Sequence, residues 1–447
     1  MSNTAATAAP DDTWEYIPVL NECIQILLTI GIGMVAGYVR VLDTEAFLPQ
    51  ATKFVFHIGL PLHILKGIGI GVNFYDDSFL WTFIAAFLVI RVIALVFCFA
   101  VAFSGGGKND GSGGTGQVAV MWLAMTWIST IILGVPIASA VFGNPIKGRT
   151  YGILAAISSF IFQLPLQLFL LECHLLEKEY LAGNDDPEID TRNDDKILAA
   201  TGSNPPAVDA DRKEDPEQPL GLDEKDPLPS EDAIEHAPED PELVQGQQVM
   251  TETENRSISL GLWLQWARSW AIWKKILLQL ARNPVLWGIV VGFFFSLTTI
   301  GPRFLNPTSD EYVPGLGWIF STATWLGECV SPVALVAMGV WMQAQGRKLT
   351  RIPLVTAILY MLSKLIVIPL IMLGLALLFN LNDEAGRAAV LIAALPISMA
   401  SFSLADRYGI GQAVLSENVA LGTIMILPTI ILWNLALDAL NLFPIAN

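Results

Sequence analysis

The sequence has little charge and lacks the short motifs by which most enzymes are recognised. Only 15% of its 447 residues are Asp, Glu, Lys or Arg, whereas 53% are hydrophobic. No phosphate-binding loop or nucleophile elbow is found, and the four cysteines stand at spacings that fit neither a metal site nor a disulfide framework. We therefore expect no enzymatic activity, no cofactor, no metal and no nucleic-acid partner, and we interpret the cysteines as buried free thiols: Cys23, Cys98, Cys173 and Cys329.

Long apolar runs are what the sequence has instead. A helix of about 20 apolar residues crosses the hydrocarbon of a bilayer. Their composition is that of helices and not the alternating pattern of a barrel strand. The sequence therefore predicts an all-α polytopic membrane protein with ten transmembrane helices, spans 1 to 10, at roughly 17–39, 51–71, 79–103, 117–141, 150–172, 284–301, 316–342, 352–379, 386–405 and 411–436.

The acidic excess of the chain is confined to its middle. Residues 177–256 hold 24 acidic and 7 basic residues, which accounts for the whole net charge of −17. The segment is rich in Pro, Asp and Glu and poor in aromatic residues, so burial cannot offset the entropy of ordering it. We expect an acidic disordered loop over 177–257, and this loop is a candidate for binding regulatory partners.

A stripe of tryptophans follows in residues 258–281, beside the cations Arg268, Lys274 and Lys275. Apolar residues recur there at intervals of three and four, which places them on one helical face. This pattern favours an amphipathic interfacial helix in the headgroup plane of an anionic leaflet. The alternative is a helix packed in the bundle. The stripe consists of Trp263, Trp266, Trp270, Trp273, Leu277 and Leu280.

Five spans lie on each side of the acidic loop, so the second half enters the membrane from the opposite face. Landmark residues recur in order in both halves, and Pro61 and Arg91 are 30 residues apart whereas Pro332 and Lys364 are 32 apart. We therefore predict two inverted five-helix repeats. They cover 17–176 and 282–440, with terminal tails at 1–16 and 441–447.

The short loops set the orientation. Placing the acidic loop on the cytoplasmic side also puts most of the Lys and Arg residues of the short loops inside, as the positive-inside rule requires, and leaves the loop cations Lys147, Arg149, Arg303 and Arg387 outside. We expect a cytoplasmic long loop, outward-facing termini, and a location in the plasma membrane or the endoplasmic reticulum.

Span 4 is interrupted in its middle. The stretch STIILGVPIASAVFG at 129–143 carries a glycine and a proline, and span 9 has a matching proline and a cluster of small residues in AALPISMASFSLADRYG. Non-helical backbone at membrane depth survives only where protein or a water-filled cavity satisfies it. Paired broken helices in inverted halves point to a transporter's binding site, where half-helix N-termini present N–H groups to an anion. We expect Pro136 to open the second half of span 4, with free N–H groups around 137–139.

Several short motifs match one family together, although each is common alone. They are LGVP at 133–136, ALP followed by ASFSLADRY within 394–408, FIAA at 83–86, Asn283-Pro284, and GVWM at 339–342. Through them the chain resembles the auxin efflux carrier (PIN-formed and PIN-like) family. The resemblance implies ten helices whose spans 4 and 9 cross at their breaks, a subdomain that moves against a scaffold of spans 1, 2, 6 and 7, export of organic anions, and a homodimer.

The broken helices and the resemblance together define candidate substrate-binding residues. Ser129 and Val285 stand where plant auxin carriers have Asn, and Ser401 stands at the family's crossover proline. These departures are compatible with carboxylate transport and argue against indole-3-acetate as the substrate. The candidates are Ser129, Gly134, Val135, Pro136, Ile137, Val285, Ser398, Met399 and Ser401.

Four ionisable residues inside the spans are candidates for supporting charge. Such groups are costly at membrane depth and must be paired or face a cavity. Arg91 and Lys364 could bind a carboxylate directly or cap carbonyls at the helix breaks, and we favour capping. His57 and Glu328 could form a proton site, but a hydrogen-bonded histidine and a glutamate paired with a cation are the favoured interpretation.

The sequence favours a membrane carrier that exports small organic anions, most plausibly monocarboxylates, by an elevator-type alternation. Two alternatives stay open. One is a cation-coupled organic-anion symporter of the bile-acid carrier type. The other is a PIN-like membrane sensor that detects a ligand and signals through the acidic loop.

Overall fold

The computed structural model describes residues 17–75, 79–104, 114–184, 270–346 and 354–444. The chain forms two compact units, residues 1–177 with 265–447 and residues 178–264, and almost all described residues belong to the first. Within the described ranges the structure is helical, and strand pairing is limited to one isolated antiparallel bridge between Ile128 and Ile397. The predicted all-α class is confirmed.

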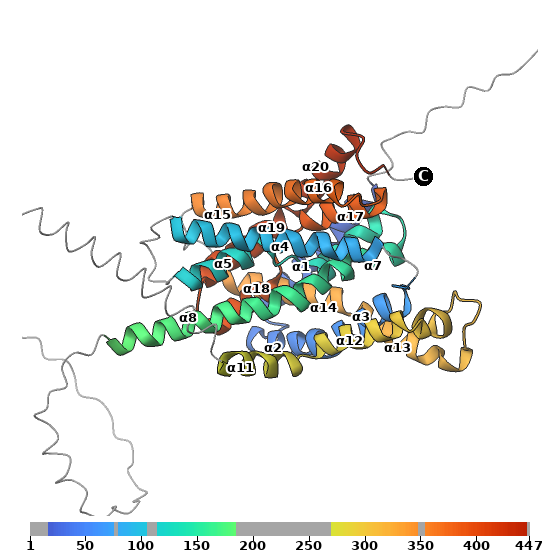
Figure 1. The fold of residues 1–447 in the computed structure, drawn as a ribbon, viewed down its shortest axis with the longest axis horizontal. Helices are drawn as coiled ribbons and strands as arrows, with labels where there is room; N and C mark the ends of the chain where they lie inside the picture. Colours follow the sequence, from blue (N-terminus) through green and yellow to red (C-terminus); the bar gives the residue numbers. More distant parts are fainter. Residues whose placement is uncertain (1–16, 76–78, 105–113, 185–269, 347–353, 445–447) are drawn as a thin grey trace, which may run out of the picture. The chain divides into compact units, whose positions relative to one another are not determined.

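Among the described residues, six continuous helical stretches are long and apolar enough to cross a membrane (Figure 1). Several contain π-helical turns, labelled η. The six are α1 (Ile17–Tyr38); α2 (Thr44–Phe54), η2 (Val55–Gly59), α3 (Leu60–Ile64) and η3 (Leu65–Ile70); α4 (Phe79–Ser104); α7 (Pro145–Ser158), η5 (Ser159–Gln163) and α8 (Leu164–Asn184); α13 (Gly317–Glu328) and α14 (Val330–Gln345); and α15 (Leu354–Leu362), η8 (Ser363–Val367) and α16 (Ile368–Leu378).

Two bent helix pairs bring the candidate spans to eight. The pair α11 (Trp270–Ala281) and α12 (Pro284–Leu297) is bent by 66°, and the pair α19 (Gln412–Ile424) and α20 (Ile426–Ala439) by 62°. Length and composition therefore support six to eight membrane-crossing helices in the described part of the chain. The predicted spans 4 and 9 are absent from this set because each is broken into pieces too short to cross a membrane alone.

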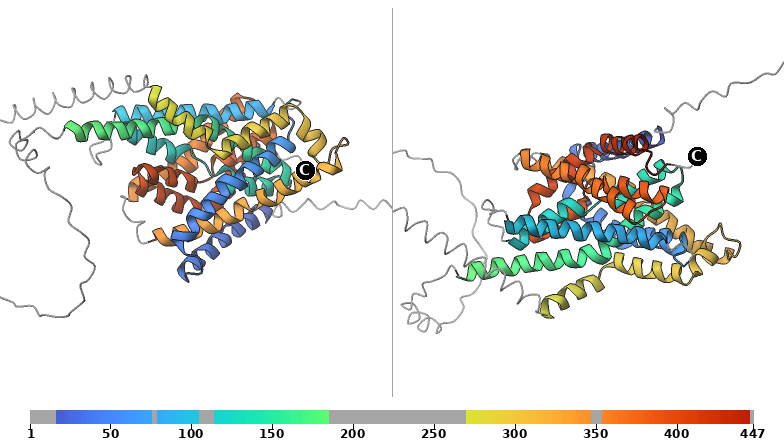
Figure 2. Two further views of the ribbon diagram at one scale, coloured as in Figure 1. Left: turned by 90° about the horizontal axis from the view of Figure 1, so that it is seen from below. Right: turned by 45° about the horizontal axis from the view of Figure 1, so that its top comes forward.

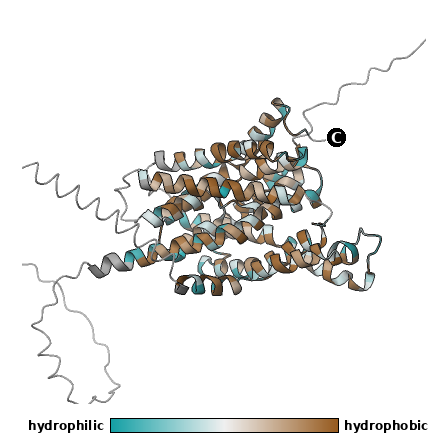
Figure 3. Cartoon of the chain, viewed as in Figure 1, coloured by the Kyte–Doolittle hydropathy of each residue, from teal (hydrophilic) through white to brown (hydrophobic). Residues whose placement is uncertain are grey.

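Helix α1 shows how these helices meet lipid on one side and protein on the other. Its buried residues include Cys23, Ile26 and Ile30, whereas Leu28 and Ile32 are more than 60% exposed. Both faces are apolar, as expected for a helix that packs on a bundle and contacts acyl chains. The hydrophobic residues in Figure 3 continue along the outer helices in the same way.

The most extensive helix contact joins α1 to α14 and includes two closely packed glycines. A Cβ atom on Gly33 would stand 2.3 Å from the carbonyl oxygen of Val336, and one on Gly339 would stand 2.1 Å from that of Ile30. Small residues of this kind let transmembrane helices approach backbone to backbone. The glycines therefore fix α1 against α14.

We expect Gly33→Ala to destabilise the protein by about 1 to 3 kcal/mol, the usual range for overpacking. Gly31→Ala is the matched control on the same helix, because no atom lies within 4 Å of its added methyl group. The measurement is the apparent melting temperature of the purified protein in detergent. Equal melting temperatures for the two variants would contradict the close contact.

The helices of the first unit pack as two groups. In the scaffold group, α1 packs on α14, α12 on α3 and η3, α13 on α3, and α14 on α2. In the crossover group, α4 packs on α7 and α5 (Gly114–Thr126), α16 on α4 and α17 (Asp383–Ala393), α17 on α7, and α19 on α15. Figure 2 shows these helices from two further sides. Contacts of η3 with α7 and of α1 with α6 (Val135–Val141) join the groups.

Several predicted boundaries differ from the structure. Helix α8 continues to Asn184, past the predicted start of the disordered loop, because its apolar pattern extends into the first acidic residues. Phe443 is buried although it lies in the predicted C-terminal tail, and Cys329 is exposed although it was expected to be buried. Residues 1–16 and the predicted loop beyond Asn184 lie outside the described residues.

Candidate substrate site at the helix crossover

Two broken helices meet at the centre of the crossover group. Helix α5 ends at Thr126, residues 127–129 are not helical, and the chain resumes in η4 (Thr130–Gly134) and α6. In the second half, α17 is followed by residues 394–398 and then by α18 (Met399–Tyr408). The backbone N–H of Ser129 donates to Pro396 O at 3.1 Å, and that of Ser398 donates to Trp127 O at 2.8 Å. Each break thus satisfies polar backbone groups of the other.

The break in the first half lies earlier than predicted. Gly134 and Pro136 fall within one helical stretch, Thr130–Val141, and Pro136 occupies its tolerated position in the first turn of α6. The N–H groups of residues 137–139 therefore lie inside a helix instead of at its start. The prediction was wrong on this point because proline marks a position near a helix start, whereas the unwound residues are set by pairing with the other half.

The half-helix starts still present free donors at the crossover. In the described part of the chain, the N–H groups of Ile131, Ile132 and Met399 have no backbone acceptor. These groups open the helices η4–α6 and α18, where the positive end of the helix dipole also lies. The arrangement favours an anion beside the break.

Two adjoining cavities of about 40 Å³ each lie against this crossover. Both are lined by Phe56, Ser129, Ile132, Ser398 and Ala400. The second also touches α14 through Ala334, Ala337 and Met338. The crossover cavities therefore lie where the crossover group meets α2, η2 and α14 of the scaffold group.

The lining is mostly apolar, with a few hydroxyl groups from both breaks. Each cavity has room for a few water molecules. A small ligand with an apolar body and one anionic group fits this chemistry, because binding sites combine apolar walls with a few placed polar groups. The chemistry of the crossover cavities therefore suits the binding of such a ligand.

The structure brings together Ser129, Ser398 and Met399 among the predicted site residues. Ser401 is fully buried behind them, where its hydroxyl donates to Ser398 O at 2.6 Å. Val285 is buried in the first turn of α12 and lines neither crossover cavity. The remaining predicted residues lie further along η4 and α6, away from both cavities: Gly134, Val135, Pro136 and Ile137.

Arg91 is fully buried and holds α4 against the α7–η5 helix. Its guanidinium donates to Gln163 Oε1 at 2.9 Å and to Ser159 Oγ at 2.6 Å. Further acceptors are the Ser158 hydroxyl and the carbonyls of Phe87 and Ala155. Gln163 in turn donates to the Thr126 hydroxyl at 2.6 Å, at the last residue before the first break. The side chain therefore supports the break instead of lining the cavities.

Lys364 occupies the corresponding place in the second half. Its Nζ donates to Ala393 O at 2.5 Å, and Ala393 is the last residue of α17. A lysine at this position satisfies a carbonyl that the broken helix leaves unpaired. These contacts are those of a carbonyl cap.

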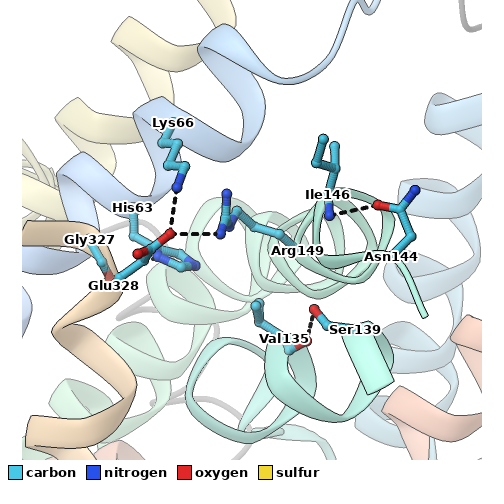
Figure 4. Close-up of polar contacts among 9 residues, drawn as sticks. All are labelled: His63, Lys66, Val135, Ser139, Asn144, Ile146, Arg149, Gly327 and Glu328. Carbon is cyan, nitrogen blue, oxygen red and sulfur yellow. Dashed lines mark hydrogen bonds and ion pairs between the residues drawn. The ribbon is translucent and has the colours of Figure 1, made fainter. Parts of the chain in front are cut away.

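His57 and Glu328 lie apart and have different surroundings. His57 is exposed, with Nδ1 3.2 Å from Lys53 O. Glu328 accepts from Lys66 Nζ at 2.7 Å and from Arg149 Nη2 at 3.3 Å (Figure 4). The buried histidine of this region is His63, whose Nδ1 is 2.9 Å from Gly327 O.

Three cations, two buried and one partly buried, were missed as functional candidates at the sequence level. Lys66 could have been found, because it is a charged residue inside span 2. Arg149 and Arg387 were counted as loop charges, yet both lie in helices. Arg387 is 2% exposed and contacts Asn434 and Asp438. Nothing in their spacing distinguishes them from loop cations.

The tryptophan helix contacts the bundle over its described part. Trp273 stacks on Phe169 with ring centroids 4.9 Å apart, and Lys275 Nζ lies 2.5 Å from Glu172 Oε2. Lys275, one of the cations beside the predicted stripe, thus pairs with a residue of α8. Trp263 and Trp266 lie outside the described residues.

Lipid-exposed apolar helices around two crossing, broken helices define an integral membrane protein of the transport class. Residues 18–434 match the family model described as membrane transport protein. The chain belongs to this family, and the resemblance to the auxin efflux carriers is confirmed.

Two relatives show how far the sequence of this chain has diverged from other members of the family. The chain is 26% identical over 172 residues to "Probable auxin efflux carrier component 5a" of Oryza sativa subsp. japonica, covering 38% of this chain and 45% of that protein. It is 27% identical over 150 residues to "Auxin efflux carrier component 5" of Arabidopsis thaliana, covering 30% and 42%. The chain thus matches less than half the length of either relative.

Proposed function

We propose that this protein exports small organic monocarboxylates by elevator-type alternating access, in which the crossover group moves against the scaffold group. The observation that carries the proposal is the antiparallel bridge at Ile128 and Ile397. It brings free N–H groups, Ser129 and Ser398 to the two crossover cavities, the second of which is also lined by α14. The crossover group of helices would hold a carboxylate there, and the scaffold group would cover it.

The proposed architecture is ten spans in two inverted repeats. Counting α5 with α6 and α17 with α18 as spans 4 and 9 adds two broken spans to the eight candidates. The packing supports the repeat: α1 with α14 corresponds to α12 with α3, and α4 with α5 corresponds to α16 with α17. We further propose a homodimer in the plasma membrane or endoplasmic reticulum, with the long loop cytoplasmic and open to regulatory partners.

Efflux of labelled benzoate from proteoliposomes tests the proposal. We expect Ser398→Ala to lower the flux about tenfold, because it removes a hydroxyl that lines both cavities and caps α18. Ser139→Ala is the matched control, since its hydroxyl bonds Val135 O within α6 and lines neither crossover cavity. Pro136→Ala should keep most of the flux, because Pro136 lies outside the break.

The same vesicles separate the alternative functions. A negative interior should speed uncoupled anion export, since one charge crossing gains about 2.3 kcal/mol per 100 mV. Flux that requires a sodium or proton gradient would indicate a symporter. Benzoate binding without flux in any gradient would indicate a sensor and contradict the carrier.

A further inference from the structure

A larger cavity of about 230 Å³, here called the basic cavity, lies apart from the crossover cavities and shares no lining residue with them. Lys66 of η3 lies ten residues beyond Phe56, which lines the crossover cavities, and ten residues of helix span about 15 Å. The basic cavity is lined by residues of η3, α7, α13 and the segment after η6 (Gly301–Leu305), with polar side chains from Lys66, Arg149, Thr150, Asn306 and Thr308.

Positive charge exceeds negative charge at this cavity. Lys66 and Arg149 both contact the same oxygen, Glu328 Oε1, at 2.7 and 3.3 Å. The side chains of Lys66 and Arg149 are 7% and 15% exposed, whereas that of Glu328 is 53% exposed. One partly solvated carboxylate therefore balances two buried cations. Buried charge without a full partner is costly, so a second anion is favoured here.

The guanidinium of Arg149 has an unused bonding edge. An arginine can hold a carboxylate by two parallel N–H donors. Glu328 uses only Nη2, and Arg149 Nε is buried without a hydrogen-bond partner. Figure 4 shows Arg149 directed toward Glu328 and Lys66. An incoming carboxylate could therefore bond the Nε edge of Arg149 while Glu328 remains in place.

The cavity is large enough for more than a carboxylate. A cavity of roughly 150 Å³ suffices to hold a benzene ring. The ring of Phe320 lies 5.5 Å from Lys66 Nζ and adds an apolar wall. An anion with one ring or a short aliphatic chain fits these dimensions.

We propose that the basic cavity is a second anion site, which binds the carboxylate of a small monocarboxylate between Lys66 and Arg149. The inference builds on the proposed function, because it gives the exported anion a second resting place on its route. Lys66 belongs to the scaffold group and Arg149 to the crossover group. A bound carboxylate would therefore bridge the two groups at one end of their contact.

Benzoate titration of the purified full-length protein in lipid nanodiscs tests this site by calorimetry. Arg149→Gln should weaken binding at one of two sites about tenfold. Glu328→Gln should tighten the same site several-fold, because it removes the competing negative charge. Lys147→Gln is the matched control: it lies on the same helix turn, pairs with Glu384 at 2.6 Å and does not line the cavity.

The opposite signs distinguish binding from a structural role. If the ion pair had only a structural role, both variants would weaken benzoate binding or unfold the protein. That outcome, or unchanged affinity in Arg149→Gln, would overturn the proposal. Ala334→Phe, which fills the second crossover cavity, separates the sites. The basic cavity should still bind benzoate in that variant, whether or not the protein transports.

Discussion

Replacing Ala334 by phenylalanine should lower benzoate flux by at least about tenfold while the protein still folds. Ala334 lies on α14 and lines the second crossover cavity opposite Ser398 and Met399. The added ring would occupy the space beside the free N–H groups of the break, where the carboxylate is proposed to bind. The side chain is partly exposed, so overpacking of the core is limited.

The control is Ala344→Phe on the same helix. Ala344 is exposed near the end of α14 and lines neither crossover cavity, so flux should stay close to that of the unmodified protein. Both variants should elute as single species in size-exclusion chromatography. Normal flux in Ala334→Phe would show that the substrate does not pass between α14 and the crossover.

Replacing Arg91 by methionine should destabilise the folded protein by about 3 kcal/mol or more. The guanidinium is fully buried and donates to the α7–η5 helix as well as to Phe87 O of its own helix, α4. Its loss leaves Gln163 Oε1 and neighbouring acceptors without donors, and each buried unsatisfied group costs about 1 to 3 kcal/mol. The apparent melting temperature in detergent should fall accordingly, and expression should fall with it.

Two further variants locate the cause of that loss. Arg91→Lys keeps the charge but has fewer donors in a different geometry, so its stability should be intermediate. Arg303→Met removes an exposed cation at η6 and should change the melting temperature little. A similar drop in Arg91→Met and Arg303→Met would show that the network around Arg91 contributes nothing specific.

Sequence patterns predicted the helical class and the two interrupted helices, because interruptions of apolar runs are local features. That the two helices cross was implied only by the resemblance to the auxin efflux carrier family. The residues of the break itself were harder. Pro136 marked the region, but the unwound residues 127–129 are fixed by bonds to Pro396 and Ser398 in the other half. Long-range pairing leaves no local pattern, so the predicted donors at 137–139 were misplaced.

The charged residues also fall into two classes: those that a local sequence pattern identifies and those that only the folded structure identifies. Arg91 and Lys364 stood out because they interrupt apolar runs, and both contact protein groups near the breaks. Arg149 was treated as a loop cation because it lies four residues after Pro145, at the start of a helix. Its pairing with Glu328 joins segments that are far apart in the sequence, and only the folded arrangement shows it.

The bridge between Ile128 and Ile397 also bears on how the protein is made. More than half of the chain separates these residues. At about 5 to 20 residues per second, the ribosome needs tens of seconds to deliver the second strand of the bridge after the first has emerged. During that interval the N–H of Ser129 and the carbonyl of Trp127 lack the partners that the second half supplies, and each unsatisfied group in hydrocarbon costs several kcal/mol. The first half should therefore wait in the insertion machinery or a chaperone, or enter the lipid as a straight helix that unwinds only when its counterpart arrives.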